Sequence, residues 1–288
     1  MGRSLRLAST QISLAPLSSP EVFWQRVETL VVKSKQQGAR VLLLPEYITL
    51  SLIVHGHEAS IPFRERLDAY ANSTYKEFER KILELAKRYA IHIVGGTYPV
   101  RLADAHVVNR CLIAKADGTS LIQDKLNMTR FEAEEWHIQS PQEPLLTIFE
   151  LDGVRCAVAI CYDVEFPRVT AMAAGAGVEL LLVPSCTDHY HGYWRVRHCA
   201  HARTVENQCF VALASVVEGD ARFPEMDVHY GQAAILTPCD GSFPERGILA
   251  EGQLNQEGLC VATLDLEELG RIRRDGSVLN LRDQNWFP

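Results

Sequence analysis

The segment Gly38-Ala39-Arg40-Val41-Leu42-Leu43-Leu44-Pro45 indicates the fold class of this chain. Its four consecutive apolar residues, 41–44, lie between a glycine turn and a proline, which is typical of a short strand buried on both faces. Segment 177–184, Gly-Val-Glu-Leu-Leu-Leu-Val-Pro, has the same order of glycine, apolar run and proline. Both segments follow a helical pattern, so we interpret them as matching strands in two similar α/β halves that pack together.

Strand patterns and helical patterns alternate from these two segments to both ends of the chain. No low-complexity linker interrupts them, which favours one α/β domain over 1–288 with its core at about 4–265. From 266 the pattern loosens into a charged tail that contains Trp286 and Phe287, and we expect this tail to fray or to dock on a partner. The predicted strands are 5–13, 41–44, 91–95, 107–114, 120–126, 154–160, 180–183, 210–217, 231–236 and 259–264, and the predicted helices are 20–37, 74–89, 166–174 and 194–207.

The charge balance and the apolar runs exclude several classes of protein. The 288 residues include 29 Lys and Arg against 36 Asp and Glu, a formal net charge of −7, whereas nucleic-acid binders usually present a basic face. No apolar run approaches the ~20 residues that span a bilayer, and the N-terminal residues show no signal-peptide pattern. The eight cysteines form no C-x-x-C pair, which favours reduced thiols over a disulfide framework. We therefore expect a cytoplasmic protein without nucleic-acid or membrane partners.

Three side chains that could carry chemistry lie at the ends of strand patterns: Glu46, Lys125 and Cys161. Ligands of open α/β sheets bind outside the carboxyl ends of the strands, so these positions are candidates for a site. A partly desolvated Glu46 would have a raised pKa and act as a base, and Lys125 would stabilise a developing oxyanion. Cys161 begins a turn into a helix, whose N-terminus would lower the pKa of the thiol. Taken singly, each has a structural alternative: a solvated acid, a surface lysine paired with Asp124, and a buried core cysteine.

Taken together, the sequences around these residues resemble the three signature blocks of the nitrilase superfamily of carbon–nitrogen hydrolases. Their order and wide separation are similar to the family pattern, and further blocks agree at 182–185, 203–207 and 231. The resemblance covers roughly 4–265 and implies a four-layer α-β-β-α sandwich. The three blocks are Pro45-Glu46, Lys125-Leu126 with Thr129, and Cys161-Tyr162-Asp163 with Phe166-Pro167.

The resemblance also implies a reaction in which Cys161 forms a thioester with the substrate. Glu46 matches the general base and Lys125 the oxyanion-stabilising lysine, which the backbone N–H of Tyr162 would assist. No metal or organic cofactor would be required. His198 and His201 share a helical face, but nearby residues do not complete a set of metal ligands.

A second glutamate is implied beyond the lysine. The register of Thr129 and Trp136 points to Glu132, and Glu134 and Glu135 remain alternatives.

The residues after Cys161 bear on the substrate. True nitrilases of the family usually carry Trp after the cysteine, whereas Tyr162-Asp163 resembles the amidase branches. We therefore expect hydrolysis of a small amide that releases ammonia or an amine. A nitrilase, an N-carbamoyl amidohydrolase and a non-catalytic scaffold or binding protein with the same fold remain alternatives.

Loops 187–194 and 218–230 would line the mouth of the pocket or an interface. The candidate substrate contacts are His189, Tyr190 and Trp194, and the other large side chains in these loops include His191, Tyr193, Arg222 and Phe223. The resemblance further implies a homodimer or higher homo-oligomer. The candidate interface is the helix that follows Cys161 and the helix around Arg203, with the C-terminal tail lying across a neighbour.

Overall fold

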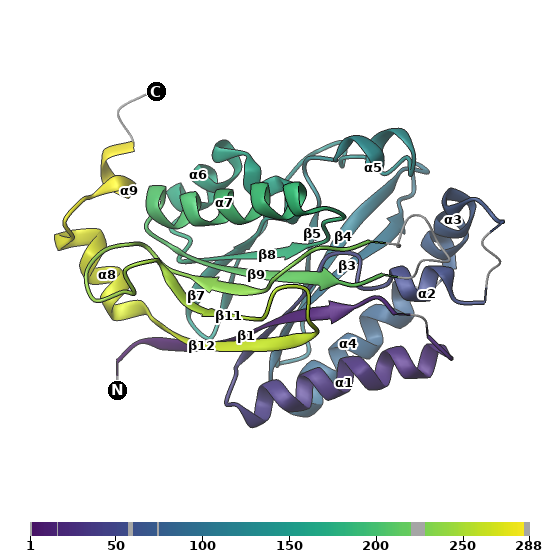
Figure 1. The fold of residues 1–288 in the computed structure, drawn as a ribbon, viewed down its shortest axis with the longest axis horizontal. Helices are drawn as coiled ribbons and strands as arrows, with labels where there is room; N and C mark the ends of the chain where they lie inside the picture. The colour runs from purple at the N-terminus through teal and green to yellow at the C-terminus, as the bar shows by residue number, and fades with distance from the viewer. Residues whose placement is uncertain (1, 16, 57–59, 74, 220–227, 285–288) are drawn as a thin grey trace.

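Figure 1 shows the computed structural model of the chain, which describes residues 2–15, 17–56, 60–73, 75–219 and 228–284. The strands are β1 (Ser4–Ser13), β2 (Val41–Leu44), β3 (His92–Arg101), β4 (Val107–Ala114), β5 (Ser120–Asp124), β6 (Ile148–Leu151), β7 (Val154–Val158), β8 (Leu180–Ser185), β9 (Phe210–Val217), β10 (Ala234–Leu236), β11 (Ile248–Glu251) and β12 (Gly258–Asp265). The helices are α1 (Pro20–Gln36), α2 (Leu50–Val54), α3 (Phe63–Ser73), α4 (Tyr75–Tyr89), α5 (Arg130–Glu134), the 3₁₀ helix η1 (Cys161–Glu165), α6 (Pro167–Gly175), α7 (Tyr190–Glu206), α8 (Leu266–Asp275) and α9 (Asn280–Asp283).

A curled sheet with helices on its outer faces forms the body of the fold. The main path of the sheet has the order β5-β4-β3-β2-β1-β9-β8-β7-β6, so β1 joins one half (β2 to β5) to the other (β6 to β9). Helices α1 and α4 lie on the opposite side of the sheet from α6 and α7 (Figure 1). This arrangement confirms the α-β-β-α fold class that the sequence predicts.

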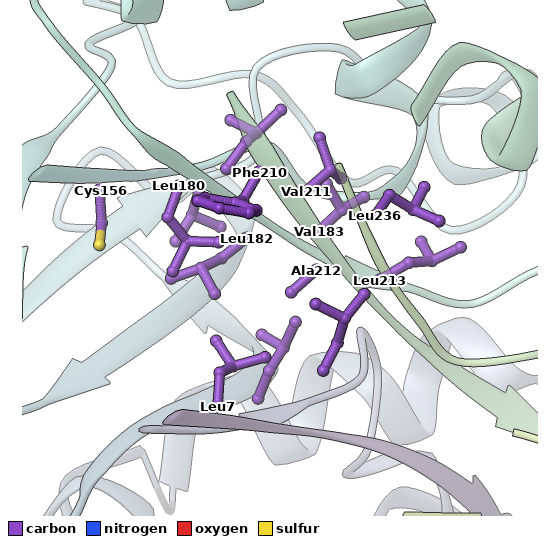
Figure 2. Close-up of a cluster of buried hydrophobic side chains, with 14 of the residues drawn as sticks. Leu7, Cys156, Leu180, Leu182, Val183, Phe210, Val211, Ala212, Leu213 and Leu236 are labelled. Atoms are coloured by element: carbon purple, nitrogen blue, oxygen red, sulfur yellow. The ribbon is translucent and has the colours of Figure 1, made fainter. Parts of the chain in front are cut away.

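The two faces of β2 show why an unbroken apolar run encodes this strand. Leu42 and Leu44 pack in a cluster with the apolar side chains of α1 and α4. Val41 and Leu43 point the other way, into the core between the two halves of the sheet. In that core, Leu7 of β1 faces the side chains of β8 and β9 (Figure 2). Every residue of β2 is buried, as expected of a strand covered on both faces.

Strand β3 is longer than the sequence predicts. The prediction ends it at Gly95, but the strand continues to Arg101 because β4 pairs with it in antiparallel register beyond that point. The register shifts between Val94 and Thr97, so the two glycines form a β-bulge. Glycines in a strand pattern mark a bulge as readily as an end, and the bulge brings β3 close to the turn after β2.

Three other predicted boundaries differ from the structure by more than two residues. Helix α7 begins at Tyr190 instead of 194, so part of the predicted loop 187–194 is helical. Strand β10 covers only Ala234–Leu236 of the predicted 231–236. A loose tail is predicted beyond 265, but the chain forms α8 there. The buried side chains of this helix pack in the hydrophobic core of the same chain. Trp286 and Phe287 lie outside the described residues.

Helix α8 has signals that explain this correction. The Asp265 side chain accepts hydrogen bonds from the backbone N–H groups of Glu267 and Glu268, at 3.0 and 2.9 Å, and so caps the helix. Leu269 and Ile272 are buried on its inner face.

No helix in the described part of the chain is long and apolar enough to cross a bilayer.

The strand directions bring the candidate residues to one edge of the sheet. Strands β1, β2 and β3 are parallel to one another, as are β7, β8 and β9, and β1 is parallel to β9. Strand β5 runs in this direction too, because β4 reverses once and β5 reverses again. The carboxyl ends of β2, β5, β7 and β8 therefore meet at the same edge, where Glu46, Lys125 and Cys161 follow.

Candidate active site

Lys125 is the centre of a buried cluster of charged side chains at this edge. Its Nζ donates to Oε1 of Glu46 at 2.8 Å and to Oε2 of Glu132 at 2.6 Å. All three side chains are at most 1% exposed. Burial alone would lower the pKa of Lys125, but the two carboxylates outweigh it and raise the pKa well above its usual value. Lys125 is therefore a fixed ammonium, and the alternative of a surface lysine paired with Asp124 is wrong; Asp124 pairs with Arg110.

Cys161 lies at the sharp turn that the sequence predicts between β7 and the following helix. Its backbone has a positive φ of 47°, a conformation that non-glycine residues rarely adopt, and it begins η1. Its Sγ lies 3.7 Å from the carbonyl oxygen of Cys186, whose backbone N–H donates to Oε2 of Glu46 at 3.0 Å. The turn therefore holds the sulfur next to the Glu46 carboxylate, at the end of β8.

The thiol of Cys161 does not have the lowered pKa that the sequence predicts. The side chain is only 4% exposed, and burial raises the pKa well above the ordinary value for a thiol. The negative charge of Glu46 raises this pKa further, and Lys125 offsets only part of the increase. The prediction is wrong because η1 is a single short 3₁₀ segment, whose dipole is too small to compensate for desolvation. The resting side chain is a thiol that needs a base.

Glu46 has the properties of such a base. Burial raises its pKa above the usual range for a carboxyl group, and the attraction of Lys125 reverses only part of this change. Its Oε1 also accepts a hydrogen bond from Nδ2 of Asn109 at 2.9 Å. A carboxylate with a raised pKa next to a buried thiol can accept the proton of that thiol and later return it.

Of the three candidate second glutamates, the structure brings Glu132 into the site. Its Oε2 accepts hydrogen bonds from the backbone N–H and the hydroxyl of Thr129, at 2.9 and 2.7 Å, in addition to Lys125. Glu134 is exposed and pairs with Arg130 at 2.8 Å, and Glu135 is exposed as well. Glu132 is the third residue of α5, a position from which its side chain reaches back to the N-cap.

We expect Glu132→Gln to reduce kcat/KM by about 100-fold or more, because it removes one of the two anions that hold Lys125 in place. The matched control is Glu134→Gln, which neutralises an exposed glutamate of the same short helix and should change kcat/KM by less than about twofold. Steady-state kinetics on a hydrolysed amide measure both. Equal effects of the two substitutions would contradict the assignment of Glu132.

Asp163 links the segment that follows Lys125 to the turn at Cys161. Its carboxylate accepts from the backbone N–H groups of Leu126, Asn127 and Ile160, at 3.2, 2.8 and 3.2 Å. Nδ2 of Asn127 donates to the same carboxylate at 3.0 Å. The sequence places Asp163 in a signature block but gives no role for it, and the structure shows that it joins two of the three blocks.

Two further residues of the site were not predicted. Asn109 lies in the predicted strand 107–114, and a polar residue in an otherwise mostly apolar run is a signal that could have identified it. Tyr47 follows Glu46 directly, and its hydroxyl donates to Oε1 of Glu132 at 2.7 Å. The sequence carries no signal for that contact, because the two residues are 85 positions apart.

Among the described residues, the predicted substrate contacts make no hydrogen bond or ion pair with Glu46, Lys125, Cys161 or Glu132. His189 is the N-cap of α7, and Tyr190 packs against His191 and Tyr230. The ring of Trp194 stacks on His198. Arg222 and Phe223 lie outside the described residues. Tyr162 lines a surface hollow of about 500 Å³ with Asn127 and Phe166, next to the lysine segment.

The histidine pair His198 and His201 interacts with other side chains of α7. Nε of Arg197 donates to Nε2 of His201 at 3.2 Å, and burial lowers the pKa of His201 to about 4. Among the described residues, no group of three or more His, Cys, Asp and Glu side chains is arranged to hold a metal ion.

Comparison with known proteins identifies the family to which this chain belongs. The family model "Carbon-nitrogen hydrolase" matches residues 6–274. The chain belongs to the carbon-nitrogen hydrolase family, which confirms the resemblance seen in the sequence.

Several relatives are similar over nearly the whole chain. A probable hydrolase of Bacillus subtilis, YhcX, is 31% identical over 97% of this chain, which spans about half (53%) of that relative. The omega-amidase NIT2 of Danio rerio is 26% identical, with 98% of this chain and 96% of the relative covered. The crystal structure of Saccharomyces cerevisiae Nit3, a member of branch 10 of the nitrilase superfamily, has a TM-score of 0.76 at 22% identity, covering 94% of each chain.

Proposed function

We propose that the chain hydrolyses the C–N bond of a small amide through a thioester on Cys161. The observation that carries this proposal is the Lys125 ammonium bonded to Glu46 and Glu132 beside a buried thiol. Such a site provides a nucleophile, a base and a fixed positive charge in desolvated surroundings, where electrostatic stabilisation of a transition state is largest.

Acylation begins when the Glu46 carboxylate takes the proton from the Cys161 thiol. The sulfur then bonds to the amide carbonyl carbon, and the carbonyl π electrons move to the oxygen. Lys125 and the backbone N–H of Tyr162 stabilise this oxyanion. The protonated Glu46 gives its proton to the amide nitrogen, the C–N bond breaks, and ammonia or an amine leaves the thioester behind.

Deacylation repeats the same proton transfers with water. Glu46 takes a proton from a water molecule as the oxygen of that water bonds to the thioester carbon. The C–S bond then breaks, the departing thiolate of Cys161 takes the proton from Glu46 and becomes a thiol again, and a carboxylic acid is released. Lys125 keeps its proton throughout, because the charge of Glu132 stabilises the ammonium.

Amides are favoured as substrates over nitriles for two reasons. Tyr162-Asp163 follows the cysteine, as in the amidase branches. The relatives include the omega-amidase NIT2 and a 2-oxoglutaramate amidase of Bacillus subtilis, which is 27% identical over 86% of this chain. N-carbamoyl compounds and nitriles remain the alternatives.

Ammonia release from a panel of small amides, carbamoyl compounds and nitriles tests the proposal. We expect turnover of at least one amide and none by Cys161→Ala. Turnover of nitriles alone would replace the amidase assignment, and absence of turnover in all three classes would favour the non-catalytic alternative.

We also propose that the chain forms a homodimer or a larger assembly through α6 and α7. These helices carry exposed apolar side chains, including Met172, Trp194 and Val205. Burying them between two copies would remove apolar surface from water. Light scattering at micromolar concentration measures the assembly, and a monomeric mass would contradict the proposal.

A further inference from the structure

We propose that Tyr47 is a positioning residue that keeps Glu132 ionised, so that Glu46 is the carboxyl group of the pair that exchanges protons. This inference rests on the proposed function. It assigns different roles to two buried glutamates that share a single lysine.

The backbone holds Tyr47 in an unusual conformation. Its φ is 51°, which is strained for an aromatic residue. Its backbone N–H donates to Oγ1 of Thr97 at 2.8 Å. The preceding Pro45 lies so close to the bulge in β3 that a Cβ on Gly96 would lie 2.2 Å from the Pro45 carbonyl oxygen. The bulge therefore fixes the turn after β2 and directs the tyrosine ring.

The side chain of Tyr47 connects this turn to α5. The residue is 2% exposed, and its ring packs edge to face against Trp136 at a centroid distance of 5.3 Å. Burial raises the pKa of Tyr47 well above its usual value, so the hydroxyl keeps its proton. It is therefore a permanent hydrogen-bond donor, and it points at Oε1 of Glu132.

The two glutamates differ in the donors that they receive. Oε2 of Glu132 accepts hydrogen bonds from Lys125 and from the backbone N–H and the hydroxyl of Thr129. Its Oε1 accepts a hydrogen bond from Tyr47 at 2.7 Å and a longer one from Asn109 at 3.4 Å. Tyr47 is thus the one short donor to Oε1 among the described residues. Glu46 receives hydrogen bonds from Lys125, Asn109, the backbone of Cys186 and the side chain of Cys161. Hydrogen bonds to the charged form favour ionisation, so Glu132 is the more stable anion.

Electrostatics agree with this division. Two carboxylates on one ammonium repel each other, so the less stabilised one takes up a proton first. Burial would raise the pKa of Glu132, but Lys125 and the hydrogen bonds outweigh it and leave the pKa below its usual value. Burial raises the pKa of Glu46. The charged and titratable groups that face this pair from the neighbouring elements are Lys125, Tyr47, Cys161 and Cys186.

The variant Tyr47→Phe tests the inference, because it keeps the ring and its contact with Trp136 and removes only the hydroxyl. We expect kcat/KM to fall by about 10- to 100-fold, the usual effect of losing a hydrogen bond to a buried charge. The lost donor makes Glu132 easier to protonate. As the pH falls, the variant should therefore take up a proton on Glu132 in addition to the one on Glu46. The acid limb of its kcat/KM profile should be steeper than that of the wild type, in which a single protonation lowers kcat/KM.

The matched control is Tyr89→Phe. The hydroxyl of Tyr89 donates to Oε1 of Glu28 at 2.6 Å, the same chemical pair outside the site, so its removal should leave the profile unchanged. In a background of Glu132→Gln, adding Tyr47→Phe should not alter the pH profile further, because the group that Tyr47 keeps ionised is absent. A Tyr47→Phe profile that superposes on the wild-type profile after scaling would overturn the inference.

A readout that needs no turnover separates this inference from the proposed function. The pH dependence of Cys161 alkylation by iodoacetamide, followed by peptide mass, reports the proton that Glu46 takes from the thiol. If the wild type hydrolyses no amide, the proposed function fails. The alkylation profiles of wild type and Tyr47→Phe then still decide the role of Tyr47, since a steeper acid limb in the variant supports it and identical limbs contradict it.

Discussion

Cys161→Ala should lower amide hydrolysis by about a million-fold, to the background of the assay, while leaving the fold intact. The loss is expected to be this large because the proposed acyl intermediate forms on the sulfur that this substitution removes. The change removes one buried sulfur atom, so we expect the free energy of unfolding to fall by only about 1 kcal/mol. Ammonia release measures the first effect and denaturant unfolding the second.

The matched control is Cys156→Ala. Cys156 is also fully buried, it lies in β7 five residues before Cys161, and burial likewise raises the pKa of its thiol. Among the described residues, no carboxylate is hydrogen-bonded to the Cys156 thiol. Its substitution should therefore lower the free energy of unfolding by a similar amount and leave amide hydrolysis unchanged. Turnover near the wild-type rate in Cys161→Ala would end the thioester mechanism. Alkylation of Cys161 no faster than that of the other cysteines would then favour the non-catalytic alternative.

The sequence locates the residues of the cluster better than it describes their chemical environment. Glu46, Lys125 and Cys161 are predictable because each lies at the end of a strand pattern, and parallel strands bring their carboxyl ends to one edge. The raised pKa of Cys161 is not predictable in the same way. It depends on burial by residues from several strands and on a carboxylate 115 positions away in the chain.

The fold was predicted to a similar extent. Strands β2 and β8 are recognisable because a strand covered on both faces needs an unbroken apolar run. The extension of β3 is not, because only its pairing with β4 shows that the glycines form a bulge. Helix α8 has a capping aspartate and regularly spaced apolar residues, which its high charge obscures. The contact between Tyr47 and Glu132 requires knowledge of the bulge and therefore of the tertiary structure.

Lys125→Ala should eliminate measurable activity and also destabilise the protein. It removes the oxyanion-stabilising charge, so we expect kcat/KM to fall by at least about 1,000-fold. It also leaves Glu46 and Glu132 facing each other without a counterion. Removing one partner from a buried ion pair typically costs about 3–5 kcal/mol, which is the expected loss in the free energy of unfolding. Denaturant unfolding at several pH values measures this, with Lys87→Ala, at an exposed position of α4, as the control.

The pH dependence of that loss identifies its cause. Without the ammonium, mutual repulsion and burial raise the folded-state pKa of at least one of the two carboxyl groups above its unfolded value. The folded state then binds more protons than the unfolded state, so the stability of the variant rises as the pH falls through the raised pKa. The double variant Lys125→Ala with Glu46→Gln should recover part of the stability at neutral pH and none of the activity, because one buried charge is gone and the base with it. A loss of stability that is the same at every pH would mean that packing, and not charge, is the main contribution of Lys125 to the fold.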